Sequence, residues 1–207
     1  MSDSSQFDHL KQLARDKRKQ HGIDTANFGL KQVREIYKAE GIKIDYHPLG
    51  NNIKALYMCD DNHHSVAVQK SLPDEPKIFA LIHELKHHYC DQELLRSGYI
   101  HCGDFNMDDP IEIGAEKFAA EFIYPIREFA HDVSLLNIQE WSETDIINFK
   151  RNCKAKVSYA YICRRLTELR LIGFNQFKGV KFQKREYEIF GAPYHLRKKN
   201  FKPRKSA

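Results

Sequence analysis

The chain has 207 residues, of which 42% are hydrophobic and 29% are charged. This composition suits one domain with a core of its own. No apolar run approaches the roughly 20 residues of a membrane-spanning helix, and the polar residues 1–6 lead into a charged segment, unlike a secretory signal. Five cysteines, an odd number at scattered positions, do not predict a disulfide framework. We therefore expect a cytoplasmic protein without membrane contact.

The net charge of +5 is unevenly distributed along the chain. Residues 174–207 carry ten Lys or Arg and two Glu, so this tail has a charge of +8 and the rest of the chain has −3. Such a tail is typical of a solvated chain end. It is equally typical of a weak, sequence-independent contact with nucleic acid or an acidic partner.

The first third of the chain predicts two helices followed by three short strands. The helices cover residues 6–20 and about 25–40, and the strand candidates cover residues 42–46, 53–58 and 66–68. Because the strands follow one another closely, they favour an antiparallel meander. The third strand is expected to form an open edge, to which an extended substrate could add.

A His-Glu-x-x-His motif follows, formed by His83, Glu84 and His87. Pro76 is placed to start a helix there, and the apolar run 78–82 predicts that this helix is buried. Positions i and i+4 lie on one face of a helix, so both imidazoles can reach a single metal ion. An adjacent Glu can then take a proton from a metal-bound water, as in zinc hydrolases.

Zinc needs at least one more protein ligand, and the residue types leave two alternatives open. Glu112 opens a predicted helix that is apolar on one face, although Asp109 to Glu112 also fits a helix capping box. His101 and Cys102 form the rival pair, since zinc accepts nitrogen and sulfur ligands as well. Zinc is preferred on ligand type, and manganese or iron would also suit two histidines and a carboxylate.

Beyond this helix, residues 135–141 read as a linker, and residues 143–152 and 158–171 read as a pair of helices. The pair could pack on the metal-binding part of the chain. It could also be a helix-turn-helix that binds DNA, since Arg164, Arg165 and Arg170 lie on the second helix.

Three segments of the chain resemble the signatures of the ImmA/IrrE family of metallopeptidases, in the family's order. They are the motif helix with its approach, residues 66–87; the helix 112–125, which reads Glu-Ile-Gly-Ala-Glu-Lys-Phe-Ala-Ala-Glu-Phe-Ile-Tyr-Pro; and the Val-Ser segment, residues 157–172. The resemblance covers about residues 24–173 and implies a zinc endopeptidase.

Residue by residue, the resemblance assigns roles to five side chains. His83, His87 and Glu112 would be the metal ligands, and Glu84 would be the general base. Glu116 would accept a hydrogen bond from a ligand histidine, outside the metal's own ligands. The family also implies a helix-turn-helix transcriptional repressor as substrate, often one from a mobile element. Tyr57, Tyr89 and His101 are open candidates for the group that stabilises the oxyanion.

The sequence departs from the family pattern at three positions. Lys86 and Arg170 each stand where the family usually has Gly, and Gly114 stands where it often has Glu. Gly114 lowers helix propensity by about 1 kcal/mol relative to Ala, which predicts close helix packing. Lys86 keeps an alternative open: a DNA-binding or repressor-binding regulatory module that has the metal site but no turnover.

We thus predict an α+β fold in four parts. A small three-stranded antiparallel sheet packs with a zincin-type His-Glu-x-x-His helix and a glutamate helix, and a C-terminal helix pair follows. The parts are an N-terminal charged helix (1–23), a metallopeptidase core (24–134), the helix pair packed on the core (135–173) and the basic tail (174–207).

Overall fold

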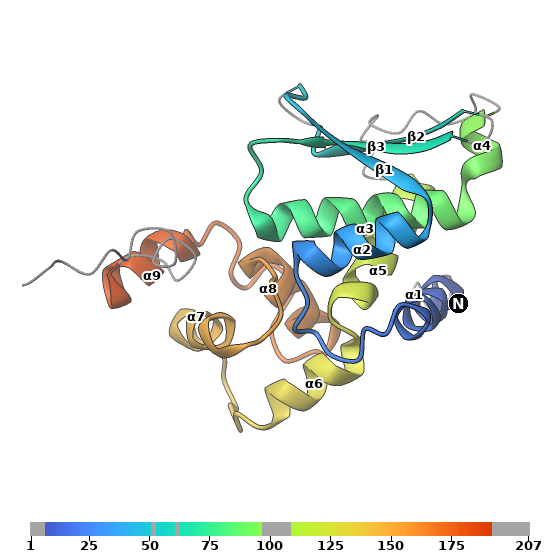
Figure 1. Ribbon diagram of the computed structural model, residues 1–207. Coiled ribbons are helices and arrows are strands. Elements are labelled where there is room, and N and C mark those ends of the chain that lie inside the picture. The colour runs from blue at the N-terminus through green and yellow to red at the C-terminus, as the bar shows by residue number, and fades with distance from the viewer. Residues whose placement is uncertain (1–6, 51–52, 61–62, 97–108, 192–207) are drawn as a thin grey trace, which may run out of the picture. The chain divides into compact units, whose positions relative to one another are not determined.

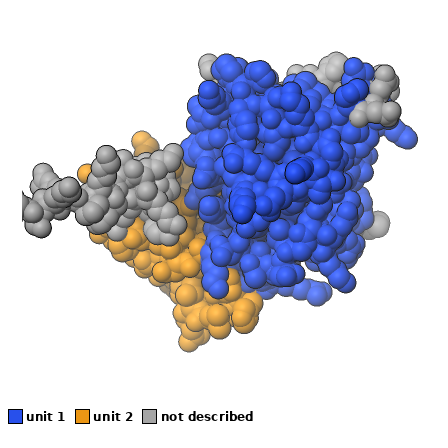
Figure 2. All heavy atoms as spheres, viewed as in Figure 1, with its two compact units in different colours: residues 1–129, 154–157 blue, residues 130–153, 158–207 orange. Residues whose placement is uncertain are grey.

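The computed structural model describes residues 7–50, 53–60, 63–96 and 109–191. The fold is α+β, as predicted. The chain divides into two compact units (Figure 2): unit 1 comprises residues 1–129 and 154–157, and unit 2 comprises residues 130–153 and 158–207. The four-part division predicted from the sequence stays a prediction.

Unit 1 holds the sheet and the first five helices (Figure 1). In chain order they are α1 (Asp8–Gln20), α2 (Leu30–Ala39), β1 (Ile42–His47), β2 (Ala55–Asp60), β3 (His63–Gln69), α3 (Asp74–Cys90), α4 (Gln92–Arg96) and α5 (Pro110–Ile123). Helix α6 (Ile126–Ser134) contains the boundary between the units, and unit 2 continues with α7 (Glu143–Asn152), α8 (Tyr159–Glu168) and α9 (Phe182–Phe190).

The sheet is mixed, so the prediction of an antiparallel meander was wrong. Its strand order is β1-β3-β2, with β1 parallel and β2 antiparallel to β3. Val66 and Val68 on β3 are fully buried, and a strand this apolar suits the central position, where both neighbours pair with it. The prediction that the third strand is an open edge was therefore also wrong: the edges are β1 and β2.

Helix α3 lies along one face of the sheet (Figure 1) and contacts β2, β3 and α5. Asp74 and Glu75 occupy its first turn, where negative charge complements the helix dipole. Every residue from 80 to 88 is buried. Because buried polar groups are costly without partners, each polar side chain in this stretch must find a partner inside the protein.

Helix α5 packs on α3 and also on α1. The approach of α1 is close: a Cβ added at Gly114 would lie 2.7 Å from Leu10 Cδ1. The prediction that Gly114 serves close helix packing is thus confirmed.

In unit 2, α7 begins with a capping box, because Ser142 Oγ accepts from the Asp145 amide and the Asp145 carboxylate accepts from the Ser142 amide. On α8, Arg165 is only 3% exposed and donates to Tyr161 Oη and Glu168. An arginine bound in this way is not free to contact DNA. The helix pair therefore lacks one of the three arginines that a DNA-binding interpretation would use.

None of the helices in the described ranges is both long enough and apolar enough to cross a membrane.

Candidate metal centre

Three side chains from two helices of unit 1 converge on one point. His83 Nε2 lies 3.0 Å from Glu112 Oε2, and His87 Nε2 lies 3.5 Å from Glu112 Oε1. The three ligand atoms all lie within 4.8 Å of one another. Ligand atoms placed about 2.0–2.1 Å from a tetrahedral zinc ion would be roughly 3.3 Å apart. The donor set therefore fits a metal ion in both chemistry and spacing.

Local sequence explains how the donors meet. His83 and His87 are one turn apart on α3, so they share the face that packs against α5. Helix α5 begins at Pro110, where the Asp109 side chain accepts from the Ile111 amide, and this places Glu112 in the first turn. The Glu112 carboxylate is directed to the histidines. The rival ligands, His101 and Cys102, lie outside the described residues.

His83 and Glu112 each stabilise the charged form of the other. Burial alone would lower the pKa of His83, but the hydrogen bond to Glu112 and the charges of Glu84 and Glu112 raise it overall. Burial alone would raise the pKa of Glu112, but the hydrogen bond to His83 and the charges of both histidines lower it overall. The site thus favours an anionic Glu112, the form that binds a cation.

Glu84 lies beside the cluster on the face of α3 that is turned to the sheet. Its side chain is buried, and its Oε2 accepts a hydrogen bond of 2.9 Å from the amide of Tyr57 on β2. Burial raises the pKa of Glu84, and the charges of His83 and His87 oppose that shift in part. A buried carboxylate with a raised pKa is suited to accept a proton.

Asp91 is a carboxylate outside the candidate ligands that pairs with one of them, and it was not predicted from the sequence. His87 Nδ1 lies 2.7 Å from Asp91 Oδ2, and the acceptor-only carboxylate makes Nδ1 the donor. Such a partner fixes the tautomer and orientation of a metal-binding histidine. The i, i+4 spacing from His87 was the available signal. The charge of Glu116 contributes to the raised pKa of His83, and its proposed hydrogen bond stays a prediction.

The two tyrosines considered for oxyanion stabilisation are engaged elsewhere in unit 1. Tyr57 Oη lies 2.7 Å from His64 Nδ1 and 2.9 Å from His88 Nδ1. Tyr89 Oη donates to Glu40 at 2.8 Å. The third candidate, His101, is outside the described residues.

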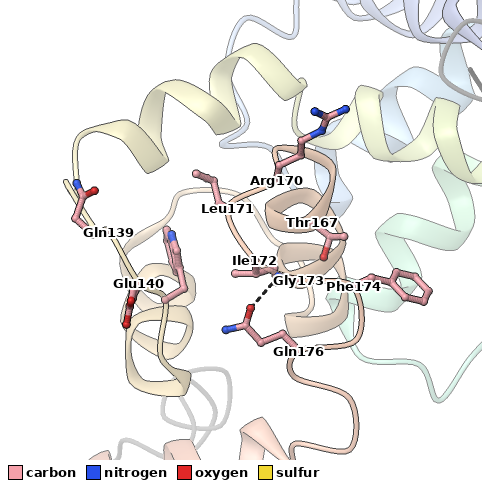
Figure 3. Close-up of a pocket in the computed structure, with 10 residues that line it drawn as sticks. Gln139, Glu140, Thr167, Arg170, Leu171, Ile172, Gly173, Phe174 and Gln176 are labelled. Carbon is pink, nitrogen blue, oxygen red and sulfur yellow. Dashed lines mark hydrogen bonds between the residues drawn. The ribbon is translucent and has the colours of Figure 1, made fainter.

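Unit 2 has a separate pocket of about 550 Å³. Figure 3 shows the Gln176 side chain accepting from the Gly173 amide, and Phe174, which is 85% exposed, at the rim. None of the ten described residues that line this pocket is a histidine or a cysteine, so the pocket does not repeat the two-histidine, one-carboxylate set of the centre in unit 1.

Comparison with known proteins shows what the chain is similar to. One solved structure, described as a Mycobacterium tuberculosis transcriptional regulator, has a similar fold, with a TM-score of 0.52 and 19% sequence identity. The match covers 77% of this chain and 46% of that chain, so the chain spans less than half the length of its structural neighbour. None of the curated proteins matches. A family model described as Peptidase_M78, IrrE N-terminal-like domain, matches residues 37–167. This match spans more than half of the chain and includes every member of the candidate centre, and the chain therefore belongs to the ImmA/IrrE family of metallopeptidases.

Proposed function

We propose that this protein is a metal-dependent endopeptidase. The observation that carries the proposal is the convergence of His83, His87 and Glu112 beside the buried Glu84, in a chain of a metallopeptidase family. When bound there, a divalent ion supplies Lewis acidity for a peptide carbonyl and for a water molecule. Zinc suits the three ligand types best, and manganese and iron are the alternatives.

In this proposal Glu84 is the general base. It accepts the proton of the attacking water and then delivers it to the leaving amine. The Tyr57 amide, at 2.9 Å, holds the carboxylate in place. Asp91 holds the ring of His87 in the orientation that leaves Nε2 directed to Glu112.

The proposed substrate is an extended protein segment that adds to β2 along the edge that, among the described residues, is not paired with another strand. Two observations support this edge over that of β1. Strand β2 contacts α3, which carries the motif, and its Tyr57 amide reaches Glu84. Extended peptides add to open strands through main-chain hydrogen bonds.

For the substrate itself we propose a helix-turn-helix transcriptional repressor. Support comes from the family and from the printed name of the structural neighbour, a transcriptional regulator. The alternative is a regulatory module that binds a repressor or DNA without cleaving. A nucleic-acid contact of the basic tail would be weak and sequence-independent. A gel shift at low and at physiological salt would detect it.

The test is a cleavage assay on a candidate repressor, chosen from the neighbouring reading frames. Purified protein with zinc should produce fragments that mass spectrometry can map, and a chelator should stop their formation. Glu84→Gln should retain zinc and produce no fragments above background. Binding of the repressor without fragments from the wild type would favour the regulatory alternative. Equal cleavage by Glu84→Gln would rule out the proposed mechanism.

A further inference from the structure

Lys86 is a lysine in the buried middle of α3. Its side chain is 4% exposed, and its Nζ contacts Asp91 Oδ2 at 2.7 Å and Ile111 O at 3.0 Å. A buried ammonium is tolerated only where such oxygen atoms replace water. Position 86 follows His83 by three residues, so the two are neighbours on the helix surface, and the contact with Ile111 shows that Lys86 reaches α5.

The two halves of the candidate metal centre meet at this ammonium. Asp91 Oδ2, which receives one hydrogen bond from Lys86, also accepts from His87 Nδ1 at 2.7 Å. Ile111, whose carbonyl receives the other, directly precedes Glu112 in the first turn of α5. A single cation thus connects the carboxylate that orients one ligand to the backbone that carries another.

Gly114 of α5 lies next to the side chain of Lys86. A Cβ at that position would lie 3.6 Å from Lys86 Cε and 2.7 Å from Leu10 Cδ1. Two departures from the family pattern, Lys for Gly and Gly for Glu, are therefore neighbours in the structure. The arrangement is a feature of this chain, in which the lysine stem passes over a helix surface that has no side chain of its own.

We propose that Lys86 is a positioning residue for the metal centre: through Asp91 and Ile111 it holds His87 and Glu112 at the separation that one ion requires. The inference rests on the proposed metal site. It predicts that loss of the Lys86 charge lowers the affinity for the metal ion, whereas a simple charge effect would raise that affinity. Removing a positive charge near a divalent cation would by itself tighten binding, whereas loss of positioning weakens it.

The experiment measures the zinc dissociation constant of the purified full-length chain by competition with a chromophoric chelator. Lys86→Met keeps the length and apolar stem of the side chain and removes the ammonium. It should weaken zinc binding at least about tenfold, the scale typical of outer-shell partners. Lys86→Arg, which retains a cationic donor, should recover part of the affinity. The absorption bands of the cobalt-substituted protein should change in Lys86→Met, because they report ligand geometry.

Arg18→Met is the matched control. Arg18 is likewise buried, and it donates to a backbone carbonyl of α5, that of Phe122, near the carboxylate of Glu128. It contacts the opposite end of α5 from Glu112. Arg18→Met should lower the melting temperature and leave the zinc dissociation constant unchanged.

A second variant covers the case in which Lys86→Met leaves Asp91 too poorly paired to fold. In Lys86→Met/Asp91→Asn no buried charge is left unpaired, and the amide oxygen at position 91 can still accept from His87. It should bind zinc weakly as well, because the link to Ile111 is lost. Unchanged or tighter binding by folded Lys86→Met or by the double variant, or equal weakening by Arg18→Met, would overturn the inference. If the wild type bound no zinc, the metal site would fail and the inference with it. Wild-type binding that Lys86→Met retains would overturn only the inference.

Discussion

The amide of Tyr57 donates to Glu84 Oε2 at 2.9 Å, which joins an edge strand of the sheet to the motif helix. The bond accounts for one requirement of a buried carboxylate, a donor in place of water. It does not remove the cost of burying the charge, since the pKa of Glu84 stays raised by burial. The group proposed as general base is therefore held in place at some cost in stability.

Neutralising Glu84 should stabilise the metal-free protein. Glu84→Gln keeps an oxygen for the Tyr57 amide and removes the buried charge. We expect a gain of about 1 kcal/mol, or roughly 2–4 °C in melting temperature for a chain of this size. Because the folded-state pKa lies above the unfolded value, the wild type loses stability as pH rises through it. The difference between the two proteins should therefore be largest at neutral pH and should close in acid.

The matched variant is Glu84→Ala, which removes the charge and also the acceptor. It leaves the Tyr57 amide unpaired, at a cost of about 1–3 kcal/mol. Thermal melts with chelator present should place Glu84→Ala below Glu84→Gln. If Glu84→Gln melted below the wild type at neutral pH, the burial argument would be wrong.

The ligand assignment predicts how zinc stabilises each variant. Zinc at 1,000 times its dissociation constant stabilises a protein by about 4.1 kcal/mol. The melting temperature of the wild type should rise by the amount that corresponds to this gain in the free energy of unfolding. Glu112→Gln should show a much smaller rise at the same zinc concentration, and Glu116→Gln should stay closer to the wild type. If Cys102→Ser abolished the zinc effect and Glu112→Gln did not, the third ligand would be the rival one.

The part of the site that sequence could predict is the part encoded within one helix. His83, Glu84 and His87 lie within five residues, and helix geometry alone places both imidazoles on one face. Glu112 needed the family resemblance, because nothing in residue types separates a ligand from a helix cap. Asp91 was missed, and Lys86 was noted only as a departure from the family pattern, because their contacts with His87 and with Ile111 depend on how α3 is buried against α5.

The sheet shows a comparable limit. Short strands bury the same side chains in either direction, so their periodicity does not fix whether neighbours are parallel. Close spacing favoured a meander, but β3, with Val66 and Val68 fully buried, lies between β1 and β2. Which strand takes the central, most buried position depends on all three strands together, so it could not be predicted from the spacing of neighbouring strands.

The close packing at Gly114 leads us to expect that Gly114→Ala destabilises the wild type but stabilises a Leu10→Ala variant. In the wild type, Gly114→Ala gains about 1 kcal/mol of helix propensity and overpacks against Leu10 Cδ1, at a cost of about 1–3 kcal/mol. We expect net destabilisation. In a Leu10→Ala background the obstructing atom is absent, so the same substitution should stabilise by up to about 1 kcal/mol. Urea unfolding of the four proteins measures both values. Stabilisation of equal size in both backgrounds would contradict close packing by α1.

The Glu40 carboxylate, which is not one of the candidate metal ligands, should contribute to stability in a pH-dependent way. Its Oε1 accepts from Tyr89 Oη at 2.8 Å and lies 2.8 Å from His21 Nε2. Burial alone would raise the pKa of Glu40, but these hydrogen bonds and the charge of Lys17 lower it overall. A carboxyl whose folded-state pKa is depressed stabilises the protein above its unfolded pKa, and this contribution is lost as pH falls through the folded-state value.

Glu40→Gln should therefore destabilise the protein at pH 7, by about 1–3 kcal/mol for the loss of a charged acceptor. The difference from the wild type should shrink as pH falls below about 4.5, where the unfolded carboxyl takes up its proton. Glu35→Gln is the control on α2, the helix that ends just before Glu40, because the Glu35 side chain is 62% exposed and lies 4.0 Å from Lys31. Such an exposed pair contributes little, so Glu35→Gln should follow the wild type at every pH. A Glu40→Gln deficit that stayed constant from pH 7 to pH 3 would show that the carboxylate charge does not stabilise the fold.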